Sequence, residues 1–419
     1  MNIKTVCELI DSNKQELFKL LSDLVKINSE SFGDYGNEKP CAEYILKLCN
    51  GLGLESEIYS PLDLENFEQS PDYFPGRNLE NRYNVTAKWK GTEDHDKLML
   101  MAHVDTVELG NEDSWEKPPL SGEIRDGKIF GRGSCDDKYA IATCLFLVKL
   151  FKDAGLVPKM NLVFNAYCDE ELGGSHGAMA AVIKDPCDIV VNLDGRKNQI
   201  WHCASGGQVV TYKYRVSGTV GSAEPTAKAF PIILKELSKF GKRRRKELEN
   251  NPYYKGTIIP DTSLRYNEIR AGNNDMDKDV GFLKFTFYTD KTKEEIWDEF
   301  SQIDSVLQKK LKPLGINSEG FNAETRFFHY GACDPHAAEI NNLVNCAKEA
   351  TGEDTLVCGS CLSDLSILLK YGSSNTFAYG CGRDFSEPGG PHQPNEFIEC
   401  DDLVNFAKRI AAYILKTLF

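Results

Sequence analysis

Hydrophobic and polar positions along the first half of the chain predict helices that alternate with buried strands. Residues 5–27 carry apolar side chains at helical spacing, and residues 139–154 are apolar almost throughout. Short apolar runs at residues 98–103, 161–167 and 188–193 predict strands that are buried on both faces. Such an alternation is typical of an α/β domain, with a mostly parallel mixed sheet between helices.

The pattern changes between residues 206 and 328. Strands are predicted at 208–216 and 279–288 because apolar and polar residues alternate there, and helices are predicted at 230–248 and 294–311. A chain of 419 residues is long enough for more than one domain. We therefore expect a smaller inserted α+β domain at residues 206–328. It would interrupt an α/β domain whose first part is residues 1–205 and whose second part is residues 329–419.

Polar residues stand directly after the three buried strands of the first part. His103 ends one strand and shares a strand face with Asp105, because residues two apart point the same way. Glu170 and Glu171 follow the second strand, and Asp194 follows the third. The carboxyl ends of strands form the ligand-binding edge of an α/β sheet, so we expect these side chains to lie together.

Two further residues outside the strands could join this group. Asp136 follows a glycine-rich stretch and precedes the helix at 139–154, where a carboxylate is also favoured by helix capping alone. His392 lies in a loop rich in proline and glycine, which is also consistent with a solvent-exposed histidine. Two imidazoles with several carboxylates suit one or two zinc ions, and two such ions form a hydrolytic clamp.

Composition narrows the class of protein. Hydrophobic residues make up 41% of the chain, as in ordinary globular proteins, and the formal net charge is −14. This acidic balance argues against nucleic acid as a partner. The first residues lack the apolar core of a signal peptide, and no run reaches the roughly 20 apolar residues of a membrane span. We therefore expect a soluble, cytoplasmic protein with no membrane partner.

Five short motifs, in order along the chain, resemble those of a known enzyme family. They are HVDTV at 103–107, GRGSCDDK at 131–138, DEELGG at 169–174, LDG at 193–195 and GGPHQPNE at 389–396. The sequence resembles the co-catalytic zinc metallopeptidases and deacylases, which include aminoacylase, acetylornithine deacetylase, succinyl-diaminopimelate desuccinylase, glutamate carboxypeptidase, and di- and tripeptidases. The resemblance implies a catalytic α/β domain interrupted by a ferredoxin-like lid domain that often dimerises.

The resemblance also implies a role for each candidate residue. Glu170 would be the general base for a metal-activated water, and Asp105 would support His103. The cofactors would be two Zn²⁺, with Co²⁺ or Mn²⁺ as alternatives. The implied metal ligands are His103, Asp136 as the bridge, Glu171, Asp194 and His392.

The implied reaction is hydrolysis of an amide bond in a small peptide or an N-acyl amino acid. Aspartate at position 194 is more similar to the dipeptidase side of the family, and an N-acyl amino acid deacylase is the alternative.

The inserted domain departs from the family pattern. Ser222 stands where the family has a lid histidine, and the strand ending at Asp290 lacks the expected arginine. A metal-binding paralogue with weak or no catalysis is therefore a second alternative, and a homodimer through the lid is expected only by resemblance.

Overall fold

The computed structural model describes residues 1–217, 222–254, 259–272 and 278–419, and the chain folds as two compact units. The first unit comprises Met1–His202, Ala332–Cys358 and Ile367–Phe419. The second comprises Cys203–Gly331 and Gly359–Ser366. The predicted insert at 206–328 falls within the second unit, whose role as a lid or dimerisation domain stays a prediction.

A nine-stranded sheet runs through the first unit in the order β1-β2-β6-β3-β7-β15-β8-β13, and β14 pairs with β8. Its four central strands, β6, β3, β7 and β15, are parallel, whereas β1, β2 and β8 pair antiparallel to their neighbours. The strands span β1 (Glu55–Tyr59), β2 (Asn84–Trp89), β3 (Asp96–His103), β6 (Asn161–Tyr167), β7 (Ile189–Asn192), β8 (Gln199–Ala204), β13 (Gly331–Ala332), β14 (Val357–Gly359) and β15 (Asn375–Gly380).

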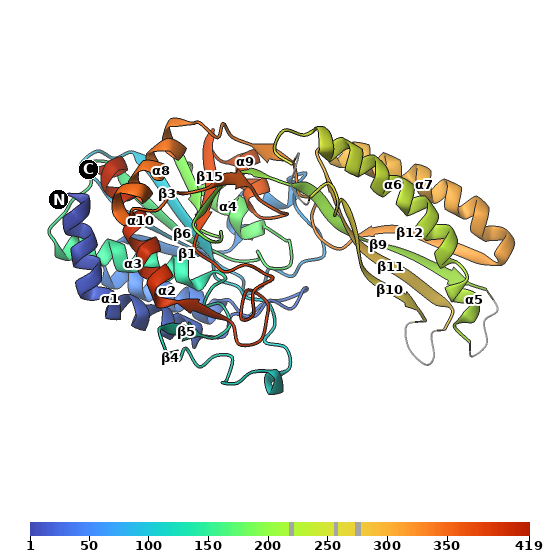
Figure 1. Ribbon diagram of the computed structural model, residues 1–419, viewed down its shortest axis with the longest axis horizontal. Helices are drawn as coiled ribbons and strands as arrows, with labels where there is room; N and C mark the ends of the chain where they lie inside the picture. The colour runs from blue at the N-terminus through green and yellow to red at the C-terminus, as the bar shows by residue number, and fades with distance from the viewer. Residues whose placement is uncertain (218–221, 255–258, 273–277) are drawn as a thin grey trace. The chain divides into compact units, whose positions relative to one another are not determined.

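Strand β3 lies at the centre of this sheet and contributes to a core on each face. Leu98 and Leu100 pack into one hydrophobic cluster, with α1, α3, α8 and α10, while Met99 and Met101 pack into a second cluster with α4. Helices α1, α3 and α10 also pack against one another (Figure 1). The helices span α1 (Ile3–Val25), α2 (Lys39–Gly51), α3 (Lys138–Asp153), α4 (His176–Lys184), α8 (Ala338–Thr351), α9 (Leu365–Tyr371) and α10 (Cys400–Leu418).

The second unit has the strand and helix order of a ferredoxin-like fold. Its antiparallel sheet runs β10-β11-β9-β12, and α6 and α7 pack on the sheet and on each other (Figure 1). The elements span β9 (Gly206–Val216), α5 (Glu224–Ala227), α6 (Phe230–Asn250), β10 (Leu264–Ala271), β11 (Val280–Thr289), α7 (Lys293–Leu311) and β12 (Ile316–Ala323). These two architectures confirm the predicted fold class.

Several strands escaped prediction from the sequence. β8, β10 and β12 were not predicted, and neither was the hairpin at residues 124–130, which pairs with a third strand. That small sheet consists of β4 (Ile124–Arg125), β5 (Lys128–Phe130) and β16 (Phe397–Glu399). Within the described part of the chain, no helix combines the length and apolarity that crossing a membrane requires.

Candidate metal centre

The predicted strand-end residues lie just beyond three neighbouring strands. His103 is the last residue of β3, Glu170 and Glu171 follow β6, and Asp194 follows β7. Because β6, β3 and β7 are adjacent and parallel, their carboxyl ends meet at one edge of the sheet. The structure therefore delivers these side chains to the same edge, as the strand pattern predicted.

Asp136 lies between two imidazoles from distant parts of the chain. Its Oδ1 is 3.0 Å from Nε2 of His103, and its Oδ2 is 3.4 Å from Nε2 of His392. The same nitrogen of His392 is 2.7 Å from Oε2 of Glu171. The ligand atoms of His103, Asp136 and Glu171 all lie within 4.8 Å of one another. Four of the predicted ligands thus converge, with the Asp136 carboxylate in the middle.

The charges of this cluster shift the pKa values of its members strongly. Burial alone would lower the pKa of His103, but its hydrogen bond to Asp136 and the charge of Glu170 raise that pKa well above its usual range. Glu171 and Asp136 likewise outweigh burial and raise the pKa of His392 to about 11. Hydrogen bonds to both imidazoles hold the pKa of Asp136 well below its usual range, although burial opposes this.

A divalent cation fits this set of donors. The Nδ1 atom of His103 donates to the backbone carbonyl of Asp105 at 2.9 Å, so Nε2 is the nitrogen that faces the carboxylates. Two imidazole nitrogens that face two carboxylates form a donor set for which a metal ion and protons would compete. Imidazole and carboxylate are ligands that zinc prefers, and a shared carboxylate suits a pair of ions.

The carboxylate of Asp105 holds the backbone of the glutamate pair. It accepts hydrogen bonds from the backbone N–H of Glu170 at 3.0 Å and of Glu171 at 3.1 Å. Its Oδ1 lies 3.7 Å from Nδ1 of His103, farther than the backbone carbonyl of the same residue. Asp105 thus supports His103 through its carbonyl and positions the two glutamates through its side chain.

Asp194 is positioned through the backbone on either side of it. The hydroxyl of the buried Tyr139 donates to the carbonyl of Leu193 at 2.7 Å and to that of Gly195 at 3.1 Å. Tyr139 lies in α3, the helix that Asp136 precedes. One tyrosine therefore links the segments that carry two predicted ligands, although the role of Asp194 as a ligand stays a prediction.

A buried ion pair joins the loops that carry Asp136 and His392. Arg132 Nη1 is 2.7 Å from Oε2 of Glu396, whose Oε1 accepts the N–H of Cys135 at 3.0 Å. The side chains of Arg132 and Glu396 are only 4% and 1% exposed.

The glycines on either side of Arg132 have φ values of +135° and +85°, so a residue with a side chain would be strained there.

We expect Glu396→Ala to lower the free energy of unfolding by about 3–5 kcal/mol, because it leaves the Arg132 guanidinium buried without its partner. Urea denaturation checks this value. Lys149→Met is the control, since Lys149 pairs with Glu16 and Asp153 at the surface and its loss should cost less than about 1 kcal/mol. Equal losses in the two variants would contradict a special contribution of the buried pair.

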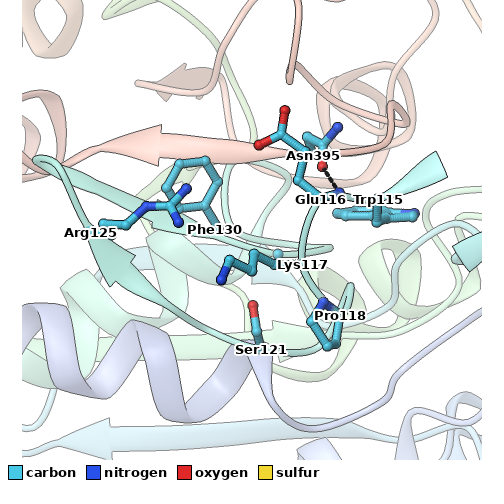
Figure 2. A pocket seen from close by; sticks show the side chains of 9 residues that line it. Trp115, Glu116, Lys117, Pro118, Ser121, Arg125, Phe130 and Asn395 are labelled. Atoms are coloured by element: carbon cyan, nitrogen blue, oxygen red, sulfur yellow. Dashed lines mark hydrogen bonds between the residues drawn. The ribbon is translucent and has the colours of Figure 1, made fainter. Parts of the chain in front are cut away.

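A small hollow lies beside this loop pair but holds none of the predicted site residues. Figure 2 shows Trp115, Phe130 and Asn395 around it, with the backbone N–H of Glu116 donating to Asn395 Oδ1 at 2.6 Å. Its cationic residues, Lys117 and Arg125, both lie within ion-pair distance of Glu123. The predicted metal ligands therefore lie at the carboxyl ends of the central strands and not in this hollow.

The predicted lid departures fall in the second unit. Ser222 is exposed, and its hydroxyl accepts the N–H of Glu224 at 3.2 Å. The glycine-rich segment before it, residues 218–221, lies outside the described residues. Arg326 of the same unit is buried and lies 3.9 Å from the buried Asp364. The effect of the two lid departures on activity therefore stays a prediction.

The fold and the cluster together define a metallohydrolase built on an α/β sheet. The sequence matches the profile of peptidase family M20/M25/M40 over residues 99–416, and the chain belongs to this family. This membership confirms the suspected family and the predicted class of enzyme.

The relatives of this chain include a metallohydrolase and a desuccinylase. It is 26% identical to an uncharacterized metallohydrolase of Methanocaldococcus jannaschii, over 94% of this chain and 97% of that protein. It is 35% identical to a succinyl-diaminopimelate desuccinylase of Wigglesworthia glossinidia brevipalpis, over 77% of this chain and 84% of that protein. The solved structure of the di-peptidase Dug1p from Saccharomyces cerevisiae shares the fold, with a TM-score of 0.72, 17% identity and 98% of both chains covered.

Proposed function

We propose that this chain hydrolyses the amide bond of a small peptide or an N-acyl amino acid and that it uses two Zn²⁺ ions, with Co²⁺ or Mn²⁺ as alternatives. The observation that carries the proposal is the position of Asp136, whose two oxygens face the Nε2 atoms of His103 and His392. A carboxylate with one oxygen toward each imidazole suits a bridge between two ions.

The proposed ligands divide into two sets that share Asp136. His103 and Asp194 would complete the first site, and Glu171 and His392 the second. When bound, the two ions would lower the pKa of a water molecule and polarise the amide carbonyl of the substrate.

Glu170, which directly precedes the proposed ligand Glu171, is the group that transfers the proton. Glu170 takes a proton from the attacking water and returns it to the leaving amine, as a general base and then a general acid. Its backbone N–H is fixed by Asp105, and its charge contributes to the raised pKa of His103, which supports a position near the candidate centre. The buried Asp105 therefore holds the backbone of Glu170.

An N-acyl amino acid deacylase is the second candidate. The desuccinylase relative, which is 35% identical over most of this chain, favours removal of an acyl group. Aspartate at position 194 instead favours the dipeptidase side by resemblance. The two candidates differ in one chemical requirement, a free α-amine on the substrate.

A matched pair of substrates separates these candidates. Glycyl-leucine and N-acetyl-leucine differ only in the α-amine, and release of leucine can be followed for both with zinc-loaded protein. A dipeptidase should cleave the first and a deacylase the second, and N-succinyl amino acids extend the acyl series. A sample treated with a chelator is the control and should cleave neither.

Two results would contradict the proposal. Hydrolysis that survives complete metal removal would exclude the metal-dependent mechanism. Two bound ions with no turnover of any substrate in the panel would favour a metal-binding paralogue without this activity.

A further inference from the structure

A single buried arginine faces three carboxylates behind the candidate metal centre. Arg82 is fully buried at the end of the segment between β1 and β2. Its Nε donates to Glu38 Oε1 at 2.7 Å, and its Nη1 lies 2.6 Å from Asp169 Oδ1. Its Nη2 donates to the hydroxyl of Ser31 at 2.8 Å and lies 3.8 Å from Asp105 Oδ2.

Two of these carboxylates contact or belong to the turn that presents the glutamate pair. Asp105 accepts the backbone N–H groups of both glutamates, and Asp169 directly precedes Glu170 in the chain. Asp169 has a φ of +64°, an uncommon conformation for a residue other than glycine. Its side chain is held by Arg82, by Arg77 and by Nδ1 of His176 at 2.5 Å.

We propose that Arg82 is a positioning residue that fixes Asp105 and Asp169 and thereby sets the place of Glu170 and Glu171 at the metal centre. This inference rests on the proposed function. The planar guanidinium is a fork, so its Nε can donate to Glu38 while its Nη1 forms an ion pair with Asp169. A lysine ammonium keeps the charge but is a single point and cannot reproduce this fork.

If Arg82 only stabilised the fold, its replacement would lower stability without weakening metal binding. A second buried arginine provides the matched control for this alternative. Arg409 in α10 is also buried, and it pairs with Glu353 and donates to the hydroxyl of Thr351 at 3.1 Å. Its Nη1 also lies 3.5 Å from the hydroxyl of Tyr379. The hydrogen bonds and ion pairs of these three partners reach none of the predicted metal ligands in the described part of the chain. Arg409→Lys therefore measures what replacement of a buried arginine costs by itself.

The test compares Arg82→Lys with Arg409→Lys by titration with Co²⁺, followed by visible absorption and calorimetry, and by steady-state hydrolysis. For Arg82→Lys we expect one of the two Co²⁺ ions to bind about 10–100-fold more weakly, as for other residues that support metal ligands. We also expect kcat to fall by a similar factor while KM stays close to that of the unchanged protein. Arg409→Lys should lower thermal stability but bind both ions normally.

The inference is overturned if Arg82→Lys binds both Co²⁺ ions like the unchanged protein, or if Arg409→Lys shows the same loss. If Arg82→Lys fails to fold, Asp169→Asn takes its place in the test. This substitution keeps nearly the same side-chain volume and removes the charge that pairs Arg82 with the turn. Metal binding by Asp169→Asn equal to that of the unchanged protein then overturns the inference. Absence of turnover in the unchanged protein contradicts only the proposed function, because the Co²⁺ comparison does not depend on hydrolysis.

Discussion

Glu170→Gln is expected to lower kcat by about 10²–10⁴-fold, the usual contribution of a general base, while both metal ions stay bound. Glutamine has nearly the shape of glutamate but cannot accept the proton of the attacking water. The backbone N–H that Asp105 holds is unchanged by the substitution, so the turn should keep its conformation. Steady-state kinetics and metal analysis by mass spectrometry on the same sample measure the two effects.

The neighbouring residue provides the control for this prediction. Glu171 contacts Nε2 of His392 at 2.7 Å and belongs to the group whose ligand atoms converge. Glu171→Gln should therefore lose bound metal, whereas Glu170→Gln should not. If Glu170→Gln retains full activity, the role proposed for this residue is wrong.

Asp136→Asn is expected to have the second large effect, a loss of bound metal together with at least about a 10³-fold loss of activity. Metal ions contribute several kcal/mol to hydrolysis, and each 1.4 kcal/mol or so is a factor of ten in rate. An amide cannot supply two anionic oxygens to the imidazoles of His103 and His392. Metal content after dialysis and kcat/KM with added Zn²⁺ check both parts of the prediction.

Asp153→Asn is the matched control for Asp136→Asn. Asp153 ends α3, the helix that follows Asp136, and its side chain is 64% exposed. This control should keep its metal and its rate. Retention of two tightly bound ions by Asp136→Asn would exclude the bridging role and would require a different ligand set.

The positions of the central strands and of the strand-end residues could be predicted because burial leaves a strong signal in the sequence. β3 is apolar on both faces and stops at His103, so both the strand and its functional end can be identified. β10 and β12 gave no such signal, because polar residues that point away from the core interrupt them. β10 and β12 are the edge strands of the four-stranded sheet, so they bury only part of their surface and resemble loops in the sequence.

The arrangement behind the metal centre could not be predicted in the same way. The polar segment that ends at Arg82 is typical of an exposed loop, yet Arg82 is buried because Glu38 and Asp169 neutralise it. Partners so far apart in the chain are identified only when the fold brings them together. The two contacts of Asp105 likewise become evident only in the structure. Its carbonyl accepts a hydrogen bond from His103, and its carboxylate accepts the N–H groups of the glutamate turn.

The order of the chain has a consequence for how the centre is completed during synthesis. His103, Asp136 and Glu171 are translated before the second unit, whereas β15 and His392 are translated after it. The nascent first unit therefore lacks a central strand and a predicted ligand until the second unit has been made, and pairing of β15 with β7 is a contact of high sequence separation. Capture of the two proposed ions would consequently be a late event in the maturation of this protein, because fragments that stop within the second unit contain neither β15 nor His392.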